Sequence, residues 1–250
     1  MNLSNETVSV LKNFASINQN LVIKSGNNIS TMSAMKNIVA SAEVKESFPT
    51  EFAIYDLNEF LASVSLFDKP SLNFKDDFVV MTEGGSTGKA LKFWYSDPSV
   101  VTTVTKEITM PECEISFSLE NSLLSNVQKA ASVIGVPDMV LEGLDSGLAS
   151  LKVTDKKNAT ANDYAVQVIV NNDDGKNLPY KFWFKVENLK LLPGKYDIKV
   201  SSKNISHFVN TNVGIQYWIA LEPESKYDAE SKEFILWKLF CGWNNIAPRI

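Results

Sequence analysis

Apolar residues recur at helical spacing between Ser118 and Gly135 and mark one side of a predicted helix. Ser118 is a suitable N-cap, because its hydroxyl can accept a hydrogen bond from a free N–H of the first turn. Gly135 can adopt the left-handed conformation that ends many helices. The opposite side carries small polar residues and Lys129, and has no acid after Glu120. The predicted apolar stripe consists of Leu119, Leu123, Val127, Ala130 and Ile134.

A second helix with the same character is predicted near the N-terminus. Ser4 can cap it, and Glu6 falls in its first turn, where the helix dipole favours an anion. Its outward side carries Lys12 and again has no acid after Glu6. Two interpretations stay open. The outward sides of both helices are either ordinary solvated faces or surfaces from which acidic residues are kept away for a functional reason. The predicted buried stripe consists of Leu3, Thr7, Val10, Phe14 and Ile17, with Leu11 beside it.

The same order of elements follows each of these helices. Short strands come first, then a short helix, predicted over Asp56–Leu66 in the first half and over Val186–Leu192 in the second. A late strand containing Trp closes each half. Strands are predicted at Leu21–Ile23, from Ile38, and at Phe52–Tyr55, Ser71–Phe74, Phe78–Thr82, Ala90–Tyr95, Cys113–Phe117, Met139–Leu141, Leu148–Val153, Tyr164–Val170, Tyr196–Val200 and Ile215–Leu221.

This repetition predicts a duplicated domain. A repeat of roughly a hundred residues exceeds the unit of a solenoid and fits the size of a domain. The stretch Ser96–Lys106 has neither helical period nor alternation and is predicted to be a linker. We therefore predict a first domain over residues 1–106, a second over 107–225, and an extension over 226–250.

Composition and charge narrow the function classes. The 250 residues are 44% hydrophobic and 21% charged, which is typical of a globular protein with a substantial core. The net charge of −5 argues against a protein that holds nucleic acid by bulk charge, but leaves room for a local basic surface. Cys113 and Cys241 form no metal or redox motif and fit a reducing compartment. Neither a signal peptide nor a membrane-spanning segment is predicted.

Patterns that resemble catalytic motifs are incomplete. Gly84–Lys89 is one residue shorter than a phosphate-binding loop, Ala90 replaces the Ser or Thr, and a strand is predicted to follow. His207 is the only histidine, which makes a histidine metal cluster or a catalytic triad hard to build. The paired aspartates Asp76–Asp77 and Asp173–Asp174 lie in turn-like contexts. We predict no catalytic residues, no metal and no cofactor.

Distinctive blocks occur at Asn2–Thr7, Leu11–Asn18, Ala53–Asn58 with Phe60–Leu61 and Ser65–Leu66, Leu192–Tyr196 and Ile219–Glu222. These blocks resemble the sliding clamps of T-even-type phages, and the resemblance extends over about residues 1–225. The resemblance implies an α+β fold of two duplicated DNA-clamp domains, with helices lining a central hole and antiparallel sheets outside, assembled as a homotrimeric ring. Members of this family encircle duplex DNA without sequence preference, tether the DNA polymerase, are placed on DNA by a clamp loader, and work in the cytoplasm of the bacterial host.

The resemblance also assigns roles to residues. The family's arrangement turns Lys12, Lys129 and Lys190 toward the hole, where sparse lysines supply weak attraction to phosphate. Each could equally be a plain solvated charge, and Lys190 has Glu187 close by. The family places the partner groove between the linker Asp97–Glu107 and the last strand, which suggests lining residues for it. These are Val101, Ile219 and Leu221.

The extension beyond the resemblance contains the strongly apolar run Phe234–Trp243. Three interpretations stay open: an accidental extension, an ordered part of the subunit, or a segment that docks in the partner groove in competition with polymerase peptides. For the third interpretation the anchors are Phe234, Leu236, Trp237, Phe240 and Trp243.

A sliding clamp is therefore the first functional hypothesis. The alternative is a β-rich phage structural or assembly protein that shares the duplicated domain but does not encircle DNA. A nuclease or NTPase ranks third, because the motifs for either are incomplete.

Overall fold

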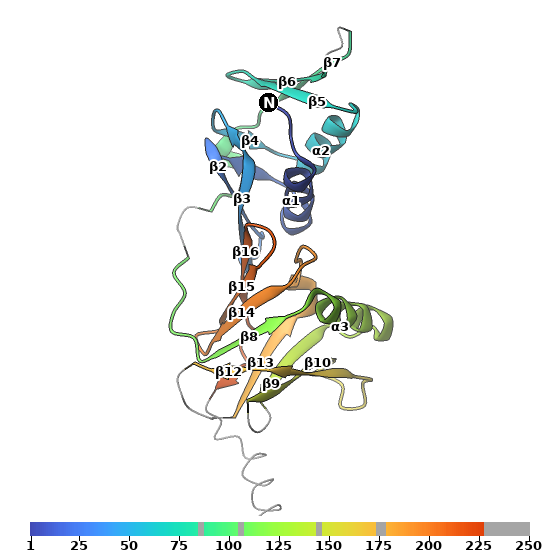
Figure 1. Ribbon diagram of the computed structural model, residues 1–250, viewed down its shortest axis with the longest axis vertical. Coiled ribbons are helices and arrows are strands. Elements are labelled where there is room, and N and C mark those ends of the chain that lie inside the picture. The colour runs from blue at the N-terminus through green and yellow to red at the C-terminus, as the bar shows by residue number, and fades with distance from the viewer. Residues whose placement is uncertain (85–87, 105–107, 144–146, 174–178, 228–250) are drawn as a thin grey trace, which may run out of the picture. The chain divides into compact units, whose positions relative to one another are not determined.

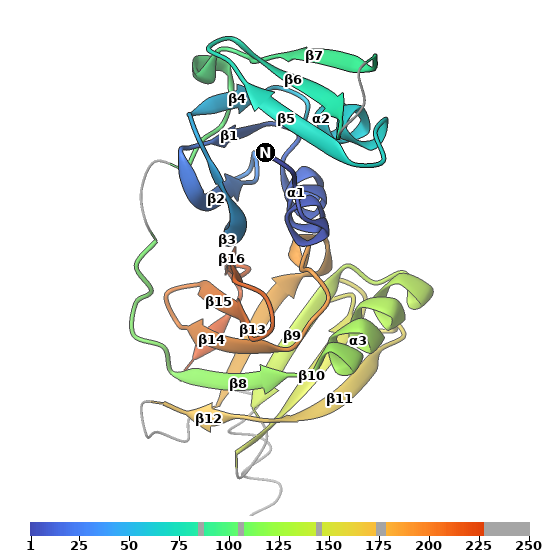
Figure 2. The same ribbon diagram turned by 45° about the horizontal axis from the view of Figure 1, so that its top comes forward.

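A computed structural model describes residues 1–84, 88–104, 108–143, 147–173 and 179–227 of the chain (Figures 1 and 2). It divides into two compact units, each assembled from separate stretches of sequence. Unit 1 combines Met1–Met110 with Glu187–Ile198 and Ile205–Ala220. Unit 2 contains Pro111–Val186, Lys199–Asn204 and the segment from Leu221. Among the described residues, no helix is long and apolar enough to cross a membrane.

Unit 1 begins with α1 (Asn5–Ile17), whose N-cap Ser4 accepts a hydrogen bond from the Thr7 N–H as predicted. The predicted stripe from Thr7 to Ile17 is buried, whereas Leu3, outside the helix, is half-buried. The helix packs against β2 (Gly26–Met32) and β3 (Ile38–Phe48). These strands continue a sheet in the order β14–β15–β16–β3–β2, with β14 (Tyr196–Ser201), β15 (Ile205–Asn210) and β16 (Ile215–Ala220).

The rest of unit 1 surrounds α2 (Leu57–Ser65), which Asp56 caps through its carboxylate, as predicted. Before it, β1 (Leu21–Ile23) pairs with β4 (Phe52–Ile54) in antiparallel fashion. After it, β5 (Pro70–Phe74), β6 (Phe78–Glu83) and β7 (Ala90–Trp94) form an antiparallel three-stranded sheet. A 3-10 turn, η1 (Pro98–Val100), follows in the predicted linker.

Unit 2 is built around a second antiparallel sheet in the order β11–β10–β9–β13–β17. Helix α3 (Asn121–Ile134) packs against β10 and β11. The strands are β8 (Ile115–Leu119), β9 (Asp138–Gly143), β10 (Leu148–Thr154), β11 (Tyr164–Ile169), β12 (Asn171–Asn172), β13 (Tyr180–Lys185) and β17 (Lys226–Tyr227). β12 pairs with β8.

The start of the central helix was predicted wrongly. Ser118 lies in β8, and Glu120 occupies the N-cap position without a side-chain capping bond. Ile115, Phe117 and Leu119 are buried at every second position, so the strand continues through the predicted start of the helix. The burial of alternate residues therefore decides the local structure here, and the capping preference of Ser118 does not. The fully buried face of α3 is accordingly Leu124, Val127 and Ala131. Gly135 ends the helix in the left-handed conformation as predicted, with φ of 70°.

The predicted helix over Val186–Leu192 was also largely wrong, because only η2 (Val186–Asn188) is helical. The backbone beyond it bonds to other elements instead of to its own preceding turn. The Lys190 carbonyl accepts from Asn13 Nδ2 at 2.9 Å, and the Leu192 N–H donates to the Tyr217 hydroxyl at 3.1 Å. These tertiary partners replace the hydrogen bonds that a helix would have supplied.

The pairing of the strands is consistent with a duplication. β1 pairs with β4 as β9 pairs with β13, and β2 pairs with β3 as β10 pairs with β11. The strands β5–β6–β7 correspond to β14–β15–β16 in order. β2 and β15 were missed from the sequence, β2 because Gly26–Asn28 has the composition of a turn.

Candidate nucleic-acid interface and partner groove

The outward face of α1 is short-chained, polar and nearly free of uncompensated acid. Its exposed residues are Asn5, Glu6, Ser9, Lys12 and Ser16. Glu6 forms an ion pair with Lys45 at 2.9 Å, and the same hydrogen bond raises the pKa of Lys45. Lys12 forms none of the ion pairs found among the described residues. The face therefore presents one free cation to solvent.

The start of α1 is fixed by the Glu46 carboxylate, which accepts hydrogen bonds from the Ser4 N–H and the Thr7 hydroxyl. Burial opposes ionisation of Glu46, but these hydrogen bonds outweigh it and lower the pKa of that carboxyl. A charged Glu46 at the positive end of the helix dipole holds the first turn in place. The position of Lys12 is thus set by a rigid helix.

Lys190 lies at the other end of α1. Its Nζ donates to the Ser16 carbonyl at 2.5 Å, next to the negative end of the helix dipole. Asn13 joins the same region, since its amide contacts both the Lys190 carbonyl and the Tyr217 hydroxyl, the latter at 2.9 Å. The structure therefore places Lys12 and Lys190 near one helix, with the Lys190 ammonium engaged in a local contact.

In unit 2, α3 presents a comparable face. Lys129 is exposed on it, and from Asn121 to Gly135 the helix carries no acid. Its exposed small polar residues are Asn121, Ser122, Ser125, Asn126 and Ser132. Such a surface can attract phosphates weakly and offers no carboxylate to repel them. The chemistry suits contact with a polyanion that has to move.

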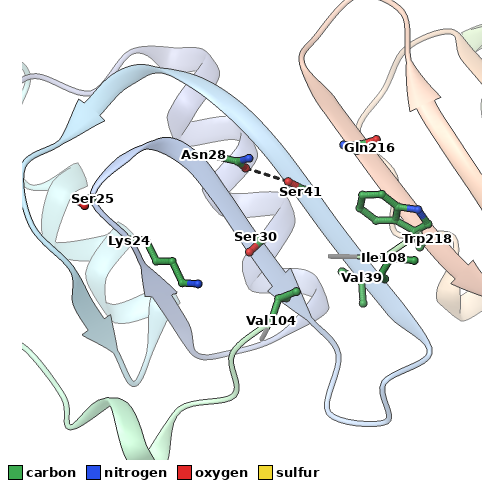
Figure 3. Close-up of a pocket in the computed structure, with 10 residues that line it drawn as sticks. All are labelled: Lys24, Ser25, Asn28, Ser30, Val39, Ser41, Val104, Ile108, Gln216 and Trp218. Carbon is green, nitrogen blue, oxygen red and sulfur yellow. Dashed lines mark hydrogen bonds between the residues drawn. The ribbon is translucent and has the colours of Figure 1, made fainter. Parts of the chain in front are cut away.

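A groove of about 550 Å³ lies on unit 1, on the sheet face opposite α1 (Figure 3). Side chains alternate along β16, so Tyr217 faces α1 while Gln216 and Trp218 face the groove. Across the strands, Val39 is the register partner of Trp218, and Trp218 is the partner of His207. The lining comprises Lys24, Ser25, Asn28, Ser30, Val39, Ser41, Val104, Ile108, Gln216 and Trp218.

None of the three groove residues predicted from the sequence lines this space. Val101 is buried with Val22 and Ala53. Ile219 is fully buried on the opposite face of β16, and Leu221 is buried in unit 2. Trp218, the neighbour of Ile219, and Val104, three residues after Val101, belong to the lining instead. Partner binding at the three predicted positions stays a prediction. The strict alternation of β16 was the signal that could have selected Trp218 in place of Ile219.

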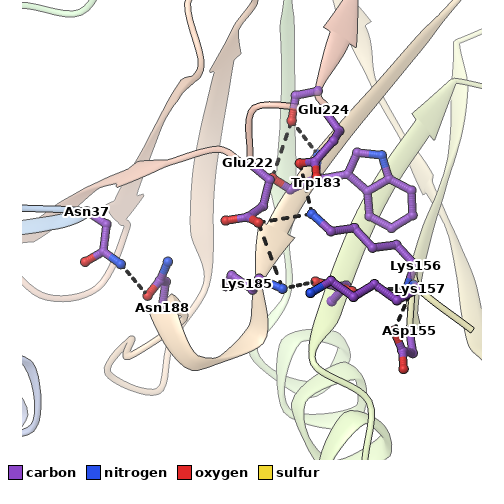
Figure 4. Close-up of polar contacts among 11 residues, drawn as sticks. Asn37, Asp155, Lys156, Lys157, Trp183, Lys185, Asn188, Glu222 and Glu224 are labelled. Carbon is purple, nitrogen blue, oxygen red and sulfur yellow. Dashed lines mark hydrogen bonds and ion pairs between the residues drawn. The ribbon is translucent and has the colours of Figure 1, made fainter. Parts of the chain in front are cut away.

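A cluster of ion pairs fastens the end of the described chain in unit 2 (Figure 4). Lys185 Nζ contacts the buried Asp138 at 2.6 Å, and Lys156 Nζ contacts Glu222 at 3.0 Å and Glu224 at 2.9 Å. Each charged side chain in the cluster contacts one of opposite sign, with two lysines shared among three carboxylates, which is typical of a structural network. The predicted docking anchors Phe234, Leu236, Trp237, Phe240 and Trp243 lie outside the described residues.

The described residues also bear on the incomplete catalytic motifs. They contain no group of three or more His, Cys, Asp or Glu side chains that could hold a metal ion. The strands on either side of the segment resembling a phosphate-binding loop, β6 and β7, pair in antiparallel fashion, and β7 follows Lys89 as predicted. A nucleotide loop would instead lead into a helix.

Comparisons with known proteins agree with this arrangement. The family of DNA polymerase processivity factors matches residues 4–103. A sliding clamp of Vibrio phage KVP40 is 33% identical over 226 residues, covering 89% of this chain and 99% of the relative. A sliding clamp of Enterobacteria phage T4 is 25% identical over 234 residues, covering 91% of this chain and all of the relative.

The fold is that of a DNA clamp. The crystal structure of Proliferating Cellular Nuclear Antigen from Entamoeba histolytica matches 87% of this chain and 95% of its own, with a TM-score of 0.62 at 13% identity. That likeness concerns the fold alone, whereas the KVP40 relative shows the family over nearly its whole length. The chain belongs to the sliding clamps, the family of DNA polymerase processivity factors.

Proposed function

We propose that this sliding clamp, a non-catalytic processivity factor in phage DNA replication, works as a homotrimeric ring that a clamp loader closes around duplex DNA in the cytoplasm of the bacterial host. In this proposal the predicted domains 1–106 and 107–225 form the ring. The faces of α1 and α3 that carry Lys12 and Lys129, together with Lys190 at the end of α1, line its hole. The groove on unit 1 receives the polymerase. The single observation that carries the proposal is a pair of unpaired strand edges.

The duplication identifies those edges. In unit 1, β3 of the first repeat pairs with β16 of the second repeat, from Ile38↔Ile219 to Ala42↔Ile215. The corresponding strands of the opposite halves are β11 and β7. Each lies at the edge of its own sheet, with one side unpaired among the described strands. If the duplication extends to pairing, β7 of one copy pairs with β11 of the next, and this head-to-tail contact generates a ring when the successive rotations close.

Apolar exposure at both edges supports a partner there. Trp94 on β7 is 60% exposed and Ile169 on β11 is 77% exposed. Large apolar side chains on an open strand edge favour pairing with another chain. The second copy of this chain is the occupant that the repeat predicts.

The charge distribution supports threading of DNA through the ring. Three copies at −5 each would carry about −15 in total, so most of the surface repels DNA. The acid-poor faces of α1 and α3 are exceptions to that repulsion. Their few lysines give weak contacts that are independent of sequence, which suits a ring whose closure supplies the persistence.

Retention on circular DNA tests the proposal. With a clamp loader and ATP, the full chain should stay on a nicked circle and be lost once the circle is linearised. Light scattering over a range of concentrations should show a trimer. A monomer at every concentration together with no retention would instead favour the structural-protein alternative.

The role of the lysines has its own matched test. Replacing either Lys12 or Lys129 by Glu, one at a time, should reduce retention at low salt roughly threefold or more, because the change removes an attraction and adds a repulsion. Lys75→Glu is the control, since Lys75 is exposed on the turn between β5 and β6. Equal losses in the lysine variants and the control would show a bulk charge effect and contradict the assignment.

A further inference from the structure

Two equivalent tryptophans have different surroundings in the two repeats. Trp94 on β7 is the register partner of Phe78, and Trp218 on β16 is the partner of His207. The ring centroids lie 5.1 Å apart in the first pair and 4.9 Å apart in the second. Trp218 is half-buried in the space that the linker lines in unit 1, whereas Trp94 is 60% exposed. The first repeat therefore leaves bare a position that is partly covered in the second.

The linker reaches Trp218 by a path that begins at β4. The Ser96 N–H donates to the Ala53 carbonyl at 2.9 Å. Val101 then packs against Ala53, and Ile108 lies beside Trp218 on the sheet face opposite α1. Ile108 is the twelfth residue after Ser96. This length of chain is enough to lead from β4 to the tryptophan.

The chain after β16 begins the same path in unit 2. The Glu222 N–H donates to the Trp183 carbonyl at 2.8 Å, and Trp183 lies on β13, the counterpart of β4 in the repeat. β17 continues along β13 to Tyr227, where the described chain ends. Phe234, the first residue of the apolar run in the extension, is the twelfth residue after Glu222. It therefore matches Ile108 in its distance along the chain from the equivalent hydrogen bond.

The bare patch on β6 and β7 suits an apolar segment that carries an acid. Its rings are those of Phe78 and Trp94, and Lys92 Nζ lies 3.9 Å from the centre of the first and 4.4 Å from that of the second. Lys92 takes part in none of the ion pairs of the described chain. In the extension, Glu233 directly precedes the apolar run Phe234–Trp243. Apolar side chains of such a segment can cover the rings while its carboxylate pairs with the lysine.

We propose that the extension joins neighbouring copies of this chain. In each copy it crosses the sheet face of unit 2 opposite α3, and its apolar run packs on Trp94 and Phe78 of the next copy. This rests on the proposed function, in which β7 of one copy lies beside β11 of the next as β16 lies beside β3. The extension then does between copies what the linker does within one. It holds the ring closed in addition to the pairing of the strand edges.

Crosslinking through the cysteine of the apolar run, Cys241, tests where the extension lies. In the full chain with Cys113→Ser, the variants Lys92→Cys and Gln216→Cys place a thiol at equivalent positions of β7 and β16. With a short bismaleimide, Lys92→Cys should give covalent dimers and trimers on a denaturing gel, roughly fivefold or more above Gln216→Cys. Equal yields would overturn the proposal. So would a crosslink within one chain of Gln216→Cys, found by mass spectrometry, because it would place the extension in the groove of unit 1.

The strength of the contact has a separate readout in the full chain. Trp237→Asp should raise the concentration at which half of the trimer has dissociated by roughly tenfold, because a carboxylate packs poorly on aromatic rings. Asn244→Asp, just beyond the apolar run, is the matched control and should leave that concentration unaltered. In a Trp94→Ala chain, Trp237→Asp should add less than about a twofold shift, since its contact is already lost. An equal shift from Asn244→Asp, or a full further shift in Trp94→Ala, would overturn the proposal.

Mass in solution and retention on a nicked circle distinguish the two levels of failure. If the full chain is a retained trimer and Lys92→Cys gives no crosslinked oligomers, the contact made by the extension fails and the clamp proposal stands. If the full chain is a monomer at every concentration and is not retained, the proposed function itself fails, and the contact between copies fails with it.

Discussion

Equivalent strands have different surroundings in the two halves of this chain. β3 and β16 pair with each other, and the residues of β16 that face α1, Ile215, Tyr217 and Ile219, are all but inaccessible to solvent. β7 and β11 occupy the matching places in the repeat and lie at open edges. Both pairs have strong strand-forming sequences. The difference shows that the same local pattern can complete a sheet within a chain or leave an edge ready for a second copy.

Lys92 on β7 limits non-specific pairing of this strand edge. Lys92 Nζ lies 3.9 Å from the centre of the Phe78 ring and 4.4 Å from that of Trp94. A lysine on an edge strand disfavours non-specific pairing with the strands of other proteins. Its contact with the Phe78 and Trp94 rings keeps the charge close to the edge. Such an edge favours a chosen partner over general aggregation.

The largest expected effect comes from a charge at the open edge. Ile169→Asp should convert the trimer to monomers at micromolar concentration without unfolding the chain, because Ile169 is 77% exposed in the isolated subunit. Light scattering gives the mass, and circular dichroism checks the fold. Met35→Asp is the control, since Met35 is 83% exposed on the turn between β2 and β3 and belongs to neither edge strand. A trimer that survives Ile169→Asp would show that β11 is not at the interface.

The opposite result is expected for the paired strand. Ile219→Asp places a carboxylate in a position with no exposed surface and should unfold the subunit, not merely dissociate it. Loss of the circular dichroism signal would confirm this. A folded monomer would mean that the pairing of β3 with β16 can open without unfolding the chain, as a subunit interface can. The pairing within the chain would then resemble the proposed pairing of β7 with β11 between copies more closely than we expect.

A smaller effect is expected from removing one hydroxyl at the inner joint. The Tyr217 hydroxyl accepts from the Leu192 N–H at 3.1 Å and contacts Asn13 Oδ1 at 2.9 Å. Tyr217→Phe leaves both groups without this partner and should lower the free energy of unfolding by about 1–3 kcal/mol in urea titrations. Tyr164→Phe, at the open edge where Tyr164 is 37% exposed, should change it by less than about 0.5 kcal/mol. Equal changes in the free energy of unfolding for the two variants would show that the hydrogen bonds of Tyr217 at the paired strand contribute no more than the exposed Tyr164 at the open edge.

Local patterns predicted most of the elements, and tertiary contacts decided the exceptions. Ser4 and Asp56 cap their helices as predicted, because capping depends on neighbouring backbone groups only. The segment after Asn188 is not helical, because Tyr217 and Asn13, far away in sequence, satisfy its backbone. No local rule contains those partners.

The candidate site was predicted unevenly for the same reason. Lys12 and Lys129 follow from helical periodicity, and both are exposed on the expected helices. The groove depends on which side of β16 faces α1 and on the approach of Val104 and Ile108. Neighbouring residues of a strand face opposite sides of the sheet, so an error of one residue changes the side. The prediction located β16 correctly but chose Ile219, which lies on the buried side.

Alkaline pH should destabilise the fold through the buried Tyr180. Burial raises the pKa of Tyr180 to about 12, and its hydroxyl has no hydrogen-bond partner among the described residues. Between about pH 10 and 12 the unfolded chain loses this proton while the folded chain keeps it, so stability falls as pH rises through that window. Urea midpoints measured from pH 9 to 11.5 should decline less steeply in Tyr180→Phe. Parallel curves for the variant and the wild-type chain would contradict this assignment.

The smallest expected effect concerns the extension over residues 226–250, which contains an apolar sequence in addition to those of the edge strands β7 and β11. If Phe234–Trp243 competes for the groove, the chain cut to residues 1–230 should bind a labelled polymerase peptide a few times more tightly than the full chain, because a tethered competitor acts at high effective concentration. Its mass should stay that of the full chain, since the edges of β7 and β11 are intact. Equal peptide affinities would exclude competition. A truncated chain that is monomeric while the full chain is trimeric would instead assign the extension to assembly, and the open edges would then be insufficient on their own to close the ring.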